Sequence, residues 1–151
     1  MTGMDMIESI LKRRLERVHT VEDLSDHLEE FLNSGCDVGT DEQTGEQFLL
    51  ETRALVERTH GLAIYIYPRE HPPPHFHVTR PGLNITFSIL DCSLLNGSAD
   101  GKTRRLITFW YHSARGKLIK IWNETRPADC PVGPIEDLGK EGVRERRGQV
   151  L

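Results

Sequence analysis

Apolar residues in the first part of the chain recur at helical spacing. From Ile7 to Val18 they fall three and four positions apart, with the basic residues off that stripe, which predicts an amphipathic helix that packs on the rest of the protein. A second helix is predicted from Thr20, whose hydroxyl can cap the first turn, to Leu32. Asn33-Ser34-Gly35 is expected to end it.

The pattern changes twice before residue 70. Residues 39–45 are polar and predict a loop, and residues 48–59 carry leucine and valine without a clean period, which we interpret as another helix. From Gly61 the period becomes two, which predicts a strand. In this strand Leu62, Ile64 and Ile66 alternate with Ala63, Tyr65 and Tyr67.

The second half of the chain predicts a hairpin and a long helix. Residues 75–80 and 83–89 alternate around the turn sequence Pro81-Gly82, which favours two antiparallel strands. Residues 102–124 return to helical spacing. Gly116 lies inside that helix, where glycine costs roughly 1 kcal/mol relative to alanine, so a kink or break is expected there.

These elements predict an α+β protein. The acidic helical extension spans residues 1–60, and the core of residues 61–126 holds a small antiparallel sheet of about three strands packed on the long helix. Residues 127–151 are rich in proline, glycine and mixed charge without an apolar period, which predicts an extended tail.

Charge and composition narrow the class of protein. The 151 residues are 37% hydrophobic and 28% charged, as in soluble globular proteins. Residues 1–60 hold 6 basic and 14 acidic side chains, net −8, and residues 61–126 hold 9 and 4, net +5. Because no apolar run of about 18 residues and no signal peptide is visible, we expect a cytoplasmic protein without membrane contact.

The cysteines exclude two kinds of site. Cys36, Cys92 and Cys130 are odd in number and form no C-x-x-C pair, so neither a disulfide framework nor a cysteine zinc site is supported.

The segment His71-Pro-Pro-Pro-His-Phe-His77 carries the strongest candidate chemistry, because three of the seven histidines lie within it. Strand alternation puts His75 and His77 on one face, beside Thr86 and Ser88, and sends Phe76 and Val78 into the core. A polyproline stretch would place His71 about 12 Å from His75.

Three interpretations of the histidines stay open. They could bind a divalent transition metal, zinc or iron, with a third ligand among His71, His112 and Asp91. They could act as an acid and base pair that cleaves RNA, with Arg80 neutralising phosphate. They could also only hydrogen-bond the backbone around a rigid proline turn.

The long helix is basic. Five of its side chains are predicted to contact nucleic acid, since they could follow a phosphate backbone: Arg104, Arg105, Arg115, Lys117 and Lys120. The alternative is a solvated helix face that pairs with the acidic extension. Trp110 and Trp122 lie beside Phe109 and Ile121 and are expected in the core rather than on a ligand.

The stretch from Gly61 to Pro127 resembles an uncharacterised prokaryotic family, domain of unknown function 4160. Its hallmark is a strand, a motif of the form His-x-Pro-Pro-His-Phe-His, a hairpin and a helix that ends in tryptophan. The matching residues are 62–67, 71–77, Trp110 and 118–122, and the N-terminal helices indicate a longer subgroup. The resemblance implies a suspected role in toxin and antitoxin pairs, but no established catalytic residues.

The leading functional hypothesis is a nucleic-acid-directed protein, specifically a toxin-like ribonuclease. Its catalytic residues would be His75, His77, His71 and Arg80, and its partners RNA or another nucleic acid and a cognate regulatory or antitoxin protein. The alternatives are a metal-binding module or metalloenzyme that uses His75 and His77, and a non-catalytic interaction protein that acts through its acidic N-terminal helices. Whether the protein is an enzyme stays open at this point.

Overall fold

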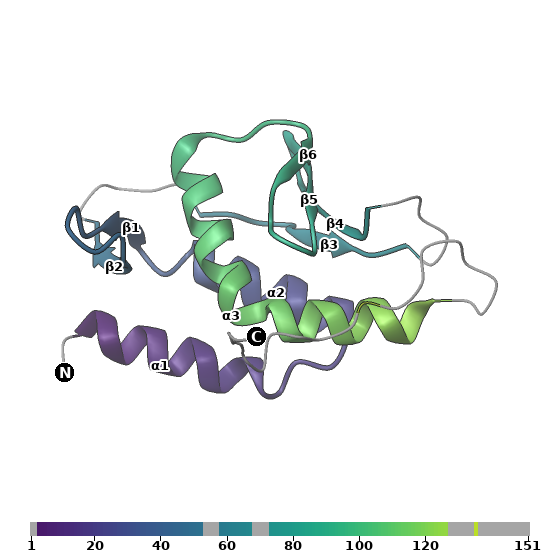
Figure 1. Ribbon diagram of the computed structural model, residues 1–151, viewed down its shortest axis with the longest axis horizontal. Coiled ribbons are helices and arrows are strands. Elements are labelled where there is room, and N and C mark those ends of the chain that lie inside the picture. The colour runs from purple at the N-terminus through teal and green to yellow at the C-terminus, as the bar shows by residue number, and fades with distance from the viewer. Residues whose placement is uncertain (1–2, 53–57, 68–72, 127–134, 136–151) are drawn as a thin grey trace, which may run out of the picture.

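The computed structural model describes residues 3–52, 58–67, 73–126 and 135, with side chains from residue 8 onward. Three helices and six strands lie in this part of the chain (Figure 1). In chain order they are α1 (Gly3–Leu15), α2 (Val21–Leu32), β1 (Cys36–Thr40), β2 (Gln47–Glu51), β3 (Ala63–Tyr65), β4 (His75–Arg80), β5 (Leu83–Ser88), β6 (Leu94–Asn96) and α3 (Gly101–Thr125).

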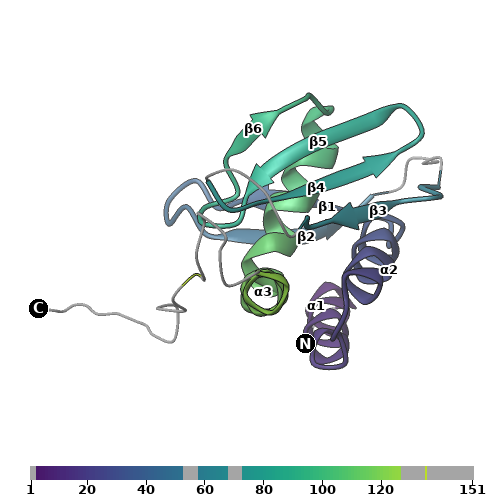
Figure 2. The ribbon, with the colours of Figure 1, turned by 90° about the vertical axis from the view of Figure 1, so that its right-hand side faces the viewer.

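The predicted α+β class is confirmed. An antiparallel sheet in the order β3-β4-β5-β6 carries the helices on one side, and β1 and β2 form a separate hairpin (Figure 2). The sheet has four strands rather than about three, because β6 joins the free edge of β5. None of the described helices has the length and apolar character needed to cross a bilayer. The expected tail lies almost wholly outside the described residues.

Helix α2 begins where its sequence predicts. The Thr20 hydroxyl accepts a hydrogen bond from the amide of Asp23 at 3.0 Å, and the Asp23 carboxylate accepts one from the amide of Thr20 at 3.1 Å. This reciprocal cap satisfies donors that the first helical turn leaves unpaired. Asn33 ends the helix as expected, and its amide group exchanges two hydrogen bonds with the backbone of Thr59.

The helix predicted over residues 48–59 is wrong. Residues 47–51 form strand β2, which pairs with β1 so that Leu49 lies opposite Val38. Only Leu49 is buried in this strand, while Phe48 and Leu50 remain exposed. The apolar residues of β2 therefore follow neither a helical nor an alternating period, so the sequence pattern did not identify this segment as a strand. Residues 53–57, inside the same prediction, lie outside the described part.

Helix α3 matches its predicted bounds within a residue or two and runs without a break through Gly116. Figure 1 shows that it changes direction along its length. Both tryptophans are buried, as expected. The extension and the histidine-containing region share one hydrophobic core, to which residues far apart in the chain contribute, including Leu24, Leu28, Phe31, Phe76, Ile85 and Trp122.

A buried histidine that the sequence patterns did not single out joins all three helices. The Trp110 indole N–H donates to Nδ1 of His27 at 2.9 Å. Nε2 of His27 lies 2.9 Å from the backbone oxygen of Leu11, so it carries the proton and donates. Both ring nitrogens are therefore used by the neutral form, and burial lowers the pKa of His27 below its ordinary value.

This arrangement gives an expected pH dependence of stability. Below pH 6.5 His27 takes up a proton in the unfolded chain more readily than in the folded chain. The free energy of unfolding is therefore expected to decrease as the pH is lowered. The loss is expected to be at most about 1.4 kcal/mol per pH unit. Urea denaturation between pH 7 and 5 measures it, with His27→Gln as the control that should flatten the slope. Equal slopes for the two proteins would contradict this role.

Candidate functional site

The two faces of strand β4 differ in chemistry. Phe76 and Val78 are fully buried against Phe87 and Ile85 of β5, which confirms their predicted place in the core. Since side chains alternate along a strand, His75 and His77 lie on the opposite face. Their partners across the hairpin are Ser88 and Thr86, as the sequence predicts.

His75 is held in a fixed orientation. Its Nδ1 lies 2.7 Å from the backbone oxygen of Pro73, and because a carbonyl only accepts, Nδ1 is the protonated nitrogen of the neutral ring. The side chain is 3% exposed. The second proline residue before the histidine thus sets both the tautomer and the direction of the imidazole.

His77 is half-buried, and its ring lies between those of His75 and Tyr67. Its Nδ1 is 3.0 Å from the hydroxyl oxygen of Thr86. The rings of His75 and His77 meet edge to face with their centroids 5.0 Å apart. The ring of Tyr67 meets His77 in the same manner at 5.2 Å.

Two tyrosines extend this face along the edge strand. Tyr65 lies opposite His77 in the register of β3 and β4, and its ring stacks on that of Tyr67 with centroids 5.8 Å apart and planes 3° from parallel. Tyr65 and Tyr67 are 43% and 47% exposed. The alternation that predicts strand β3 also predicts that both rings point away from the core. This pattern indicates from the sequence that the two tyrosines could belong to the site.

We refer to Tyr65, Tyr67, His75 and His77 as the aromatic face. Its edge carries a positive charge, because the guanidinium of Arg126 donates from Nη2 to the backbone oxygen of Tyr67. The same group lies over the ring of Trp122, with its central carbon 3.5 Å from the ring centroid. This is a cation–π contact, and it connects the end of α3 to the aromatic face.

The structure does not bring Arg80 to the histidines. Arg80 follows Phe76 and Val78 at a spacing of two, so it leaves β4 on the face opposite to His75 and His77, and its Nε is buried without a hydrogen-bond partner in the described part of the chain. The prediction that Arg80 shares their site conflicts with this alternation. His71, the remaining member of the predicted catalytic set, lies outside the described residues.

Within the described part of the chain, neither Asp91 nor His112 forms a three-residue metal-binding group with His75 and His77. Asp91 accepts a hydrogen bond from the amide of Ser93 at 3.0 Å, and hydrogen bonding from Ser93 lowers its pKa. His112 belongs to α3, one of the helices that cover the other side of the sheet (Figure 2), and its ring lies beside that of Tyr111. Among the described residues, no group of three histidine, cysteine, aspartate or glutamate side chains could hold a metal ion.

The described cysteines are not candidate nucleophiles. Cys36 and Cys92 are buried free thiols, and burial raises the pKa of both, to about 12 for Cys92. Because the thiolate is the reactive form, both cysteines are protonated and unreactive at neutral pH. Cys130 lies outside the described residues.

Three of the five predicted nucleic-acid-binding residues of α3 form hydrogen bonds within the protein. Arg105 donates from Nε and Nη2 to the two carboxylate oxygens of Asp37 at 3.2 and 3.0 Å, and this pair lowers the pKa of Asp37. Arg115 donates to the Tyr111 hydroxyl, and Lys117 to the backbone oxygen of Glu16. The contact of Arg105 is the pairing with the acidic extension that the alternative interpretation expected. Arg104 and Lys120 are exposed.

Comparison with known proteins gives one match. Residues 61–123 match the model of a family described as Domain of unknown function (DUF4160). No curated protein and no solved structure matches the chain. The matched residues begin just before β3 and end near the C-terminus of α3, so they contain the whole aromatic face.

Proposed function

We propose that this protein, whose residues 61–123 match the DUF4160 family model, binds single-stranded RNA on its aromatic face. The observation that carries the proposal is the parallel, half-exposed pair of Tyr65 and Tyr67 beside His77. Single-stranded nucleic acids bind to such platforms because unpaired bases stack on aromatic rings.

The position of the tyrosines supports a ligand rather than a packing role. Tyrosine rings buried in a core contribute to stability, but these two leave nearly half of their surface in water. Tyr65 ends β3, an edge strand of the sheet, and Tyr67 follows it by two residues, so the pair lies at the end of an edge strand rather than in the middle of the sheet. The ring of His77, which contacts that of Tyr67, adds polar atoms beside the tyrosine rings.

Charge at the edge of the aromatic face also suits RNA. The guanidinium of Arg126 reaches the backbone at Tyr67, so a phosphate beside a base stacked on this tyrosine would meet a positive charge. Charged groups of this kind provide much of the affinity for nucleic acids and make it salt-dependent. Sequence preference would then come from contacts of His77 with base edges.

A double substitution tests the proposal. Tyr65→Ala with Tyr67→Ala is expected to weaken binding of a fluorescent single-stranded RNA of roughly 12 nucleotides at least tenfold, because stacking contributes about 1 to 3 kcal/mol per base. Fluorescence anisotropy measures the dissociation constant. Phe48→Ala removes an aromatic residue that is equally exposed, on the separate β1 and β2 hairpin, and should leave the constant unchanged.

Two results would count against the proposal. One is wild-type protein that shows no saturable binding, and the other is equal affinity for the double variant and the wild type. Circular dichroism of each variant must show an unchanged fold, which is expected because both rings are removed from the surface and leave no cavity in the core.

RNA cleavage is a second candidate function. The observation that favours it is the pair of imidazoles whose rings lie 5.0 Å apart, each with Nδ1 engaged by a neighbouring oxygen. Fixed imidazoles beside a bound phosphodiester can transfer protons in its cleavage. Because His75 is 3% exposed, we assign contact with the substrate to His77 and a positioning role to His75.

A further inference from the structure

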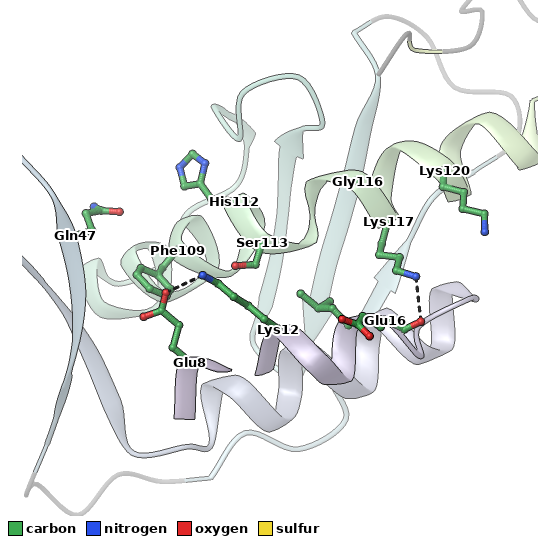
Figure 3. Close-up of a pocket in the computed structure, with 11 residues that line it drawn as sticks. Glu8, Lys12, Glu16, Gln47, Phe109, His112, Ser113, Gly116, Lys117 and Lys120 are labelled. Carbon is green, nitrogen blue, oxygen red and sulfur yellow. Dashed lines mark hydrogen bonds and ion pairs between the residues drawn. The ribbon is translucent and has the colours of Figure 1, made fainter. Parts of the chain in front are cut away.

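A second candidate site lies on the helical side of the molecule, away from the aromatic face. Helices α1 and α3 diverge around a groove of about 880 Å³ that strand β2 borders at one end through Gln47 (Figure 3). A groove of this size matches the 300 to 1,000 Å³ that small-molecule sites usually enclose. We call it the α1/α3 groove.

The spacing of its residues explains why both helices line it. On α1, Glu8, Lys12 and Leu15 or Glu16 follow one another at three or four positions and therefore share a face. On α3 the same spacing relates Phe109, Ser113, Gly116 and Lys120.

Gly116 keeps the α1/α3 groove open. A Cβ atom built at this position would meet no other atom within 4 Å, so the space beside the helix backbone is empty rather than filled by a neighbour. Glycine inside a helix costs roughly 1 kcal/mol relative to alanine. The lack of a side chain at Gly116 therefore leaves space for a ligand over the backbone of α3.

One end of the groove is built around the ring of Phe109, with Gln47, His112 and Ser113 near it. The ring of Phe109 stacks on that of Phe31 with centroids 6.1 Å apart and planes 12° from parallel, which fixes it as a wall. Leu15 adds a buried aliphatic surface beside it. At the rim the ammonium of Lys12 lies 3.2 Å from the carboxylate of Glu8, so these two charges are paired with each other.

The opposite end is positive. Lys117 and Lys120 lie together beyond Gly116, away from Phe109 (Figure 3). The ammonium of Lys117 donates one hydrogen bond, at 3.3 Å, to the backbone oxygen of Glu16, which positions it. Of its three donors, this is the one that pairs within the described part of the chain. The groove thus carries two lysines, with Glu16 beside them, at one end and the ring of Phe109 at the other.

We propose that the α1/α3 groove binds a small organic anion whose charged group contacts Lys117 and Lys120 and whose apolar body lies over Gly116 and Leu15 against Phe109. The ligand class is an aromatic or aliphatic molecule with one acidic group, such as a carboxylate. The groove lies on the far side of the sheet from the aromatic face, so this inference stands independently of RNA binding.

The dye 8-anilinonaphthalene-1-sulfonate tests the proposal, because it combines one anionic group with an aromatic body. Its fluorescence is expected to rise on titration into the full chain with saturable, one-to-one binding. Gly116→Leu places a branched side chain in the groove between Phe109 and the two lysines and should weaken this binding about tenfold or more, whereas Gly116→Ala adds only a methyl group and should retain it. Equal binding by the Gly116→Leu variant and the wild type overturns the proposal.

The role of charge has its own control. The variant with Lys117→Gln and Lys120→Gln is expected to bind the sulfonate dye at least about tenfold more weakly, since a hydrogen bond to a charged group contributes about 1.5 to 3 kcal/mol. Its affinity for the uncharged analogue N-phenyl-1-naphthylamine should not change. An equal loss for both dyes, or for neither, shows that the groove does not select an anion and overturns the proposal.

Two copies of the chain could also fill each other's grooves. Light scattering distinguishes this case, because the small-ligand proposal expects the same mass for the wild type and the Gly116→Leu variant. A fall from dimer to monomer on this substitution would assign the groove to a second copy and overturn the proposal.

Discussion

Replacing Trp122 with alanine is expected to lower the free energy of unfolding by about 3 to 5 kcal/mol, as for other large aromatic residues removed from a core. Trp122 is fully buried in the core that the N-terminal helices share with the sheet and α3. Its ring also carries the guanidinium of Arg126, which would lose this contact. The substitution therefore leaves a cavity and weakens the attachment of α3 to Tyr67.

Urea denaturation followed by circular dichroism measures this loss. Leu95→Ala is the matched control, because Leu95 is an exposed residue of the edge strand β6 and its removal should change stability by no more than about 0.5 kcal/mol. A single transition for the wild type is expected, since residues of the extension and of residues 61–126 belong to one core. A loss of less than 1 kcal/mol in the Trp122→Ala variant would show that the ring packs less tightly than its burial indicates.

The elements that the sequence predicts well are those with a regular apolar period. In α2 and α3 the buried residues repeat at helical spacing, and in the hairpin of β4 and β5 the apolar residues alternate with polar ones. The start of α2 carries additional information, because the reciprocal cap between Thr20 and Asp23 requires particular side chains three positions apart. Local chemistry alone therefore fixes these bounds.

The sequence pattern did not predict the short strands β2 and β6, and the reason is physical. Strand β2 buries one residue out of five, and β6 has three residues of which only Leu94 is partly buried. Strands of this kind are held by pairing with a neighbour rather than by burial of one face, and pairing across distant residues leaves no mark on the local pattern. The same holds for His27, whose partners Leu11 and Trp110 are 16 and 83 positions away.

For the candidate site, alternation predicted more than residue type did. Alternation puts His75 and His77 together on the face opposite Phe76. The same rule puts Arg80 on the face of Phe76, away from both histidines. It also places Tyr65 opposite His77 once the pairing of β3 with β4 is known. What no pattern indicates is the burial of His75, which depends on how the chain covers the face.

The largest effect on activity is expected at His77. If the protein cleaves RNA, His77→Asn should lower the rate by about 100- to 10,000-fold, which is the usual contribution of a positioned acid or base. Asparagine can keep a hydrogen bond to Thr86, whose hydroxyl lies 3.0 Å from Nδ1 of the histidine, but it cannot take up and release a proton near neutral pH. The geometry of the site is then preserved while the chemistry is lost.

The assay separates cleavage from binding. Cleavage of a labelled single-stranded RNA is followed on denaturing gels with purified wild type and His77→Asn, and the anisotropy assay gives the affinity of the same two proteins. Retained affinity with lost cleavage supports proton transfer by His77. Equal cleavage by both proteins would contradict this role, because the cleavage would then not depend on His77. A contaminating ribonuclease would give the same result. Binding without cleavage by the wild type would leave the aromatic face as a binding surface alone, because the platform formed by Tyr65 and Tyr67 does not depend on a titrating group.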